Sequence, residues 1–274
     1  MNQLPDFIKQ VNRPVYKYRY SVCTLVTRKQ EYLEMLASFT EAGFTPDICE
    51  YLIVDNSEVN QMDAYDGLNS FLQKAGGEYV ILCHQDILLI NKNSKQLLDE
   101  QIAQMDARDP KWGVLGNAGA AARLYDRLAI KIAYPDGFVD IKGKLPQQVC
   151  SIDENFMLVK NEANLSLSGD IGGYHLYGLD LCMVAGLLGY SAYVIDFLLV
   201  HKSTGNADGT FHSTLRLVKS KYTQFLKGRY INTTIARFYL SGSVFKNVLF
   251  NTRVFRRVLK TAEEINVKLF NKYK

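Results

Sequence analysis

The chain has 274 residues, of which 47% are hydrophobic and 22% are charged, and its formal net charge at pH 7 is +4. These ordinary values exclude a disordered chain and are typical of a globular α/β protein with a substantial core. The five cysteines have no Cys-x-x-Cys spacing, the N-terminal segment has no basic stretch leading into an apolar run, and no apolar run of about 18 residues occurs. We therefore expect a cytoplasmic protein that does not span a membrane.

The first 90 residues alternate between strand and helix patterns. A β-branched and aromatic run at 18–26 predicts a strand, and apolar residues at helical spacing between 32 and 39 predict the helix that follows it. A second strand ends at Asp55, a second helix covers about 62–75, and a third strand ends in the sequence 84–86. This βαβαβ order predicts parallel strands joined by right-handed crossovers.

The alternation continues to about residue 212. We predict helices at 94–107 and 176–188, strands at 112–115 and 190–196, and short antiparallel strands with loops at 129–160. Glycine and alanine crowd residues 116–122 without the G-x-G-x-x-G spacing of dinucleotide sites or the lysine of a P-loop. That segment suits either a phosphate cradle or tight packing.

The last part of the chain is basic and has a helical pattern. Residues 221–274 hold 12 Lys or Arg against 2 Glu. Such helices could form an amphipathic surface that contacts anionic lipid or a polyanionic acceptor, or they could pack on the sheet and leave a solvated basic face. We predict an α/β domain at 1–212 and a basic helical region at 213–274.

Polar side chains follow two of the predicted strands. Asp55 and Asp86 should share one edge of the sheet, where open α/β sheets bind their ligands. His84 and Asp86 point the same way in an extended chain, so both could reach one cation, and His201 after another apolar run could complete the site. A divalent cation on a nucleoside diphosphate needs only one or two protein carboxylates. Alternatively, Asp86 caps a loop and the histidines are structural.

Asp180 is the candidate for proton transfer. It stands early in the predicted helix 176–188, and His175 precedes it. A buried carboxylate there could act as a general base towards an acceptor hydroxyl. The alternative is an Asp that favours a helix N-terminus through the helix dipole.

Several ordered motifs resemble glycosyltransferase family 2 in the GT-A fold, over about residues 18–205. They are Thr24-Leu-Val-Thr-Arg28, Ile53-Val-Asp-Asn-Ser57, His84-Gln-Asp86, Ile152-Asp-Glu-Asn-Phe-Met157, Tyr174-His-Leu-Tyr-Gly-Leu-Asp-Leu-Cys182, Gly189-Tyr-Ser-Ala-Tyr-Val-Ile-Asp196 and Val200-His201. The resemblance implies a Rossmann-like, mostly parallel sheet flanked by helices, with a helical C-terminal extension. It also implies a donor half at about 18–116 and an acceptor half at about 117–212.

The resemblance implies a role for each matching residue. The residues implied to bind the nucleoside-diphosphate sugar are Thr27, Arg28, Asp55, Asn56 and Asp86. Those implied to bind Mn²⁺ or Mg²⁺ are Asp86, His201 and His84. On the acceptor side it implies an acceptor-segment role for Asp153 and a catalytic-base role for Asp180, with His175 as the second candidate.

These assignments predict an inverting, metal-dependent glycosyltransferase that acts on a glycan or lipid-linked acceptor in polysaccharide or glycolipid assembly. If the basic region binds anionic lipid, the enzyme works at the inner membrane face. We expect no nucleic-acid partner. Two departures favour a rival, a nucleotide-sugar-binding protein without transfer activity. His84 occupies the first acidic position of the metal motif, and Gly178 stands where an acid is usual. A nucleotidyltransferase is disfavoured because residues 24–30 contain no glycine.

Overall fold

The computed structural model describes residues 5–203, 209–255, 257 and 261. The chain divides into two compact units, Met1–Leu215 and Arg216–Lys274. The boundary between the units falls within helix α5 (Gly209–Leu226). The domain boundary that we predicted between residues 212 and 213 stays a prediction. Part of the basic region, at 256, 258–260 and 262–274, lies outside the described residues.

Helices and strands make up both units. The other helices are α1 (Lys29–Glu41), α2 (Ala64–Lys74), α3 (Ser94–Arg108), the 3-10 turn η1 (Asn161–Ala163), α4 (Tyr177–Leu187) and α6 (Val244–Phe250). The strands are β1 (Tyr18–Val26), β2 (Cys49–Asp55), β3 (Gly77–Cys83), β4 (Ile87–Leu88), β5 (Trp112–Gly116), β6 (Ala118–Ala120), β7 (Leu128–Ala133), β8 (Val139–Lys142), β9 (Gln147–Val149), β10 (Ser151–Ile152), β11 (Phe156–Lys160), β12 (Ser191–Val194), β13 (Leu199–His201), β14 (Arg229–Asn232) and β15 (Arg237–Leu240).

The main sheet has the strand order β2-β1-β3-β11-β5-β12-β9. Its first three strands are parallel, as the βαβαβ pattern predicts. β11 lies antiparallel between β3 and β5, and β9 lies antiparallel beside β12. The other five strands run in one direction, so the sheet is mixed but mostly parallel, as predicted. The predicted α/β class of a sheet flanked by helices is confirmed.

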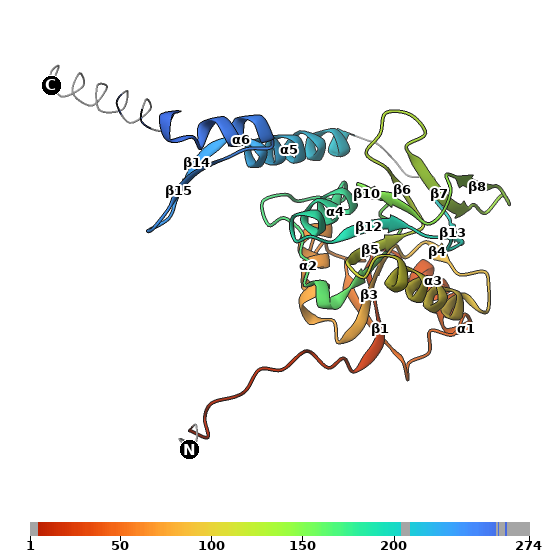
Figure 1. Cartoon of the computed structure of the whole chain (residues 1–274). Coiled ribbons are helices and arrows are strands. Elements are labelled where there is room, and N and C mark those ends of the chain that lie inside the picture. The colour runs from red at the N-terminus through yellow and green to blue at the C-terminus, as the bar shows by residue number, and fades with distance from the viewer. Residues whose placement is uncertain (1–4, 204–208, 256, 258–260, 262–274) are drawn as a thin grey trace. The chain divides into compact units, whose positions relative to one another are not determined.

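Helices cover both faces of the main sheet (Figure 1). α1 and α3 bury Phe39 and Ile102 against strand residues such as Tyr20 and Ile81 in one continuous core. On the other face, α2 contacts β1 and α4 contacts β5 and β12. Burial of each such large apolar side chain contributes about 1.5–3 kcal/mol. The core therefore holds the carboxyl ends of β1, β2 and β3 at one fixed edge.

A second sheet lies beyond that edge. Its order is β10-β6-β7-β13-β4, and β8 pairs with β7. The short strands β4 and β13 pair antiparallel, which sets His201 opposite Ile87. This pairing joins the segment after β3 to a segment more than 100 residues later in the chain.

The second unit contains a hairpin that the helical pattern did not predict. β14 and β15 pair antiparallel, and the rings of Tyr230 and Tyr239 meet edge to face at 5.2 Å across the pair. Thr233 N–H donates to Ala236 O at 2.7 Å and closes the turn. Aromatic and β-branched residues on both sides of this turn favour strands over helix. Within the described residues, the helices are too short or too polar to cross a bilayer.

Candidate functional site

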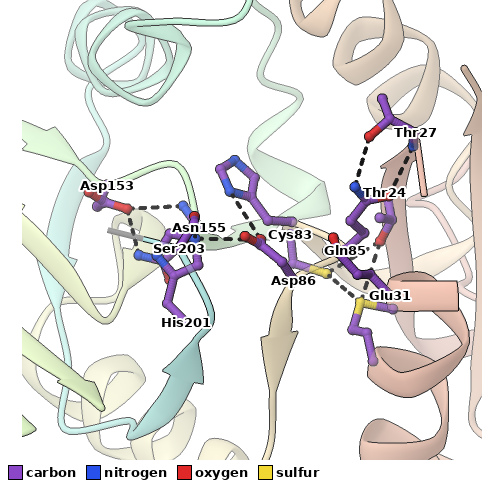
Figure 2. A network of polar contacts seen from close by, with 12 residues as sticks. Thr24, Thr27, Glu31, Cys83, Gln85, Asp86, Asp153, Asn155, His201 and Ser203 are labelled. Carbon is purple, nitrogen blue, oxygen red and sulfur yellow. Dashed lines mark hydrogen bonds and ion pairs between the residues drawn. The ribbon is translucent and has the colours of Figure 1, made fainter. Parts of the chain in front are cut away.

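Asp86 lies between two histidines just beyond the carboxyl end of β3. Its Oδ1 is 3.5 Å from His201 Nε2 and 3.8 Å from His84 Nδ1. One ligand-capable atom from each of the three residues lies within 4.8 Å of those of the other two. Figure 2 shows Asp86 between His201 and Gln85. The structure therefore brings together the three residues that the sequence suggested as metal ligands.

Backbone pairing fixes this triad. Lys202 N–H donates to Asp86 O at 2.9 Å, next to the β4–β13 pair, and His84 N–H donates to Asn155 O at 3.0 Å. The His84 ring nitrogen Nε2 lies 2.8 Å from the Tyr177 hydroxyl at the start of α4. These contacts leave His84 Nδ1 facing Asp86.

The protonation states suit a cation. Burial alone would raise the pKa of Asp86, but the hydrogen bond and charge of His201, together with the charge of His84, hold that pKa well below its ordinary value. Burial lowers the pKa of the His84 ring despite the nearby Asp86 carboxylate. Metal ligands must be deprotonated, so an ionised Asp beside a neutral His fits a divalent ion. Two imidazoles and one carboxylate suit Mn²⁺ better than Mg²⁺, which prefers oxygen ligands.

A cavity of about 370 Å³ adjoins the triad on the β1 side. Thr27, Arg28, His84 and Asp86 are among the residues that line it. Gln85, which sequence analysis did not single out, accepts hydrogen bonds from the N–H groups of Thr27 and Arg28, each at 2.9 Å. Gln85 thereby ties the loop after β1 to the loop after β3, as Figure 2 shows for Gln85 and Thr27.

Asp55 and Asn56 reach the same edge of the sheet but are not among the residues that line this cavity. Asp55 accepts from the hydroxyl and N–H of Ser57, and these bonds with Lys29 lower its pKa to about 2. The buried Asn56 amide donates to Met62 O and accepts from Gln61 N–H. Asn56 therefore organises the loop before α2, and its role in nucleotide binding stays a prediction.

A second cavity of about 730 Å³ lies on the other side of the triad. Asp153, His175 and His201 line it, with an apolar wall from β6 and β7. His175 Nε2 is 3.0 Å from Thr210 Oγ1 in α5. Gly119 also lines this cavity, but a Cβ there would lie 2.4 Å from Ser151 O. That distance favours tight packing over a phosphate cradle for residues 116–122.

Asp180 lies away from both cavities. It is fully buried, and its two carboxylate oxygens accept from the N–H and hydroxyl of Ser168, each at 2.7 Å. Neither cavity has Asp180 in its lining. A general base must reach the acceptor hydroxyl. The position of Asp180 disfavours that role, and its assignment as the base stays a prediction.

Glu154 is the acid that sequence reasoning missed. It lines both cavities, and burial raises the pKa of its carboxyl to about 8 although helix N–H groups oppose the rise. The neighbouring Asp153 is exposed and lines only the second cavity. The one sequence signal was that two adjacent acids, Asp153 and Glu154, stand just before the strongly apolar β11.

Comparison with solved structures identifies the fold. A mannosyltransferase from Pyrobaculum calidifontis, solved with GDP-Man and Mn²⁺, superposes with a TM-score of 0.50 over 79% of this chain, at 14% identity. This chain spans 66% of the length of that enzyme. Glucosyl-3-phosphoglycerate synthase from Mycobacterium tuberculosis superposes with a TM-score of 0.45 at 11% identity, and the match covers 83% of this chain and 88% of that enzyme. The protein has the GT-A fold of nucleotide-sugar glycosyltransferases, with a metal-capable triad at its carboxyl edge.

A relative in sequence is more similar. The protein called ATP synthase subunits region ORF 6, from Fuscovulum blasticum, is 34% identical over 246 residues, which cover 88% of this chain and 98% of the relative. The chain belongs to the same family as that protein. No family model matches the sequence.

Proposed function

We propose that this protein is a metal-dependent glycosyltransferase of family 2 that moves a sugar from a nucleoside-diphosphate sugar to an acceptor hydroxyl with inversion. The observation that carries the proposal is the triad of His84, Asp86 and His201 between two cavities at the carboxyl edge of a GT-A fold. The smaller cavity, lined by Thr27 and Arg28, would hold the donor. The larger cavity would hold the acceptor.

The proposed reaction needs a cation, and the triad would supply its protein ligands. When the bond between the sugar and the diphosphate breaks, negative charge develops on the diphosphate, and a bound divalent ion neutralises it. Asp86 and His201 would hold the ion, and His84 would complete the protein ligands. Phosphate oxygens and water fill the remaining positions in such sites. Asp55, with a strongly ionised carboxylate, would bind the nucleoside from the neighbouring strand end.

A thermal-shift panel tests the donor site. UDP, GDP, dTDP and CDP are each added with Mn²⁺, with Mg²⁺ or with EDTA. A nucleotide at about 100 times its Kd stabilises the native state by about 2.7 kcal/mol, and for a protein of this size each kcal/mol raises Tm by about 2–4 °C. We expect one nucleotide to raise Tm with Mn²⁺ and not with EDTA. Absence of a shift with all four nucleotides would contradict the proposal.

The rival is a GT-A protein that binds the donor without transferring it. His84 in place of an acid is the observation that favours it, since the site is then less anionic. Slow hydrolysis of nucleoside-diphosphate sugars separates the two: a transferase releases free nucleoside diphosphate with Mn²⁺, and a silent binding protein does not. The donor base and the sugar follow from the same assay.

We further propose peripheral contact of the second unit with anionic lipid at the inner membrane face, in a cytoplasmic enzyme. Ile235 is 95% exposed at the hairpin turn, and Val244, Phe245 and Val248 on α6 are at least 67% exposed. Exposed cations accompany these apolar side chains at Arg229, Arg237, Lys246 and Arg253. Apolar residues next to basic ones are typical of segments that lie in the interface of anionic bilayers.

Co-sedimentation with vesicles checks this contact. We expect binding to phosphatidylcholine vesicles that contain phosphatidylglycerol and little binding to phosphatidylcholine alone. The double variant Phe245→Ser with Val248→Ser should lose most of the binding. Phe138→Ser, which removes an apolar side chain that is 58% exposed in the first unit, should keep it. Equal sedimentation with both kinds of vesicle would rule out the membrane contact.

A further inference from the structure

Glu154 lies where the two cavities meet. Four residues line both of them: His84, Glu154, Tyr174 and Ser203. Glu154 is the carboxylic acid in this set. A donor in the smaller cavity and an acceptor in the larger one would therefore face each other across its side chain.

A glycine lies directly beside this carboxylate. Gly178 N–H donates to Glu154 Oε1 at 3.3 Å, at the N-terminal end of α4. A Cβ on residue 178 would lie 2.2 Å from Ile152 O and 3.3 Å from Glu154 Cγ. The backbone carbonyl of Ile152 therefore excludes a side chain at 178, and the Glu154 side chain lies against the same face of this glycine. With the backbone in this arrangement, residue 178 cannot carry an acid, whereas Glu154 places one beside it.

The surroundings give this acid the properties of a base. Burial and the charge of Asp153 raise the pKa of Glu154, the N–H groups of residues 176–178 lower it, and the net result is a pKa of about 8. A general base works best when its pKa lies near the operating pH. By contrast, the carboxylate of Asp180 is fully buried and hydrogen-bonded to Ser168.

We propose that Glu154 is the catalytic base of this protein and supplies the acid that residue 178 lacks. The inference rests on the proposed transferase function. The acceptor oxygen attacks the anomeric carbon, and the bond from that carbon to the diphosphate oxygen breaks. Its electron pair leaves with the nucleoside diphosphate, and the acceptor proton passes to the Glu154 carboxylate. No other reactant is required.

Glu154→Gln tests the assignment, because the amide keeps an oxygen for Gly178 N–H but cannot accept the proton. Nucleoside diphosphate release is measured with Mn²⁺ and UDP-glucose, UDP-N-acetylglucosamine, GDP-mannose and dTDP-rhamnose. We expect kcat to fall by about 10²–10⁴-fold. Tm and Mn²⁺-dependent binding of the nucleoside diphosphate should stay unchanged. The exposed Glu162→Gln serves as the matched control and should turn over like the wild type.

The pH profile separates a base from a helix cap. Wild-type kcat should rise with pH through an apparent pKa near 8, and that rise should be absent in Glu154→Gln. Full turnover by Glu154→Gln, or a loss of Tm that matches the loss of turnover, would overturn the assignment. A wild type that binds nucleotide and releases none from any donor would instead overturn the proposed function, and the base assignment with it.

Discussion

Asp86→Asn will abolish the Mn²⁺-dependent stabilisation by nucleotide and lower turnover by about 10³-fold. The substitution keeps the side-chain volume but removes the only carboxylate of the triad, which lies 3.5 Å from His201 and 3.8 Å from His84. Two imidazoles without a carboxylate bind a hard cation weakly. A metal ion supplies several kcal/mol of transition-state stabilisation, at about 1.4 kcal/mol for each factor of ten. Thermal shift with nucleotide and Mn²⁺, followed by donor hydrolysis, measures both effects.

The ligand-free protein provides the control for Asp86→Asn. Ligand-free Asp86→Asn should still fold, because the segment after β3 is held by backbone pairing of β4 with β13. Its Tm should be only moderately lower than that of the wild type, since the variant loses the interactions that hold the pKa of Asp86 low. Asp66→Asn, on the exposed side of α2, should keep both nucleotide binding and turnover. If Asp86→Asn retained a Mn²⁺-dependent shift, the cation would bind elsewhere.

Asp180→Asn will destabilise the fold and leave the chemistry of the surviving protein intact. The Asp180 carboxylate is fully buried and accepts two hydrogen bonds from Ser168. The amide can accept only one of them and turns a donor towards the other, and each hydrogen bond to a charged group contributes about 1.5–3 kcal/mol. We expect a loss of about 2–4 kcal/mol and a fall in Tm of roughly 5–15 °C. Denaturant unfolding and thermal melting measure the change.

Turnover per folded molecule decides how to interpret Asp180→Asn. It should stay within about threefold of the wild type when measured well below the lowered Tm, since Asp180 lines neither cavity. The two variants Asp180→Asn and Glu154→Gln should thus behave in opposite ways, one losing stability and the other losing turnover. An Asp180→Asn protein with unchanged Tm and no turnover would restore the sequence-based assignment of the base.

The sequence was most informative where local patterns determine structure. The strand at 18–26, the helix that follows it and the strand that ends at Asp55 all formed as expected, because their apolar periodicity matches the faces that they bury. Asp86 and His201 came together because β13, which ends at His201, pairs with β4, which begins directly after Asp86. These residues were predictable without any knowledge of side-chain packing.

The features that the sequence pattern did not predict depend on packing between residues far apart in the chain. Periodicity does not show that β11 inserts antiparallel beside β3, or that the turn before α4 brings Gly178 against Glu154. An acid at a helix start has the same sequence pattern whether it faces a cavity or, like Asp180, a buried serine. The hairpin of the second unit was hidden by apolar residues whose spacing also suits a helix.

Manganese anomalous diffraction tests the central claim most directly. A crystal is grown with Mn²⁺ and the nucleoside diphosphate that gives the largest thermal shift, and data are collected at the manganese absorption edge. We predict one anomalous peak at the triad, within coordination distance of Asp86 and His201 and next to the diphosphate. A nucleotide bound with no manganese between its phosphates and the triad would contradict the account.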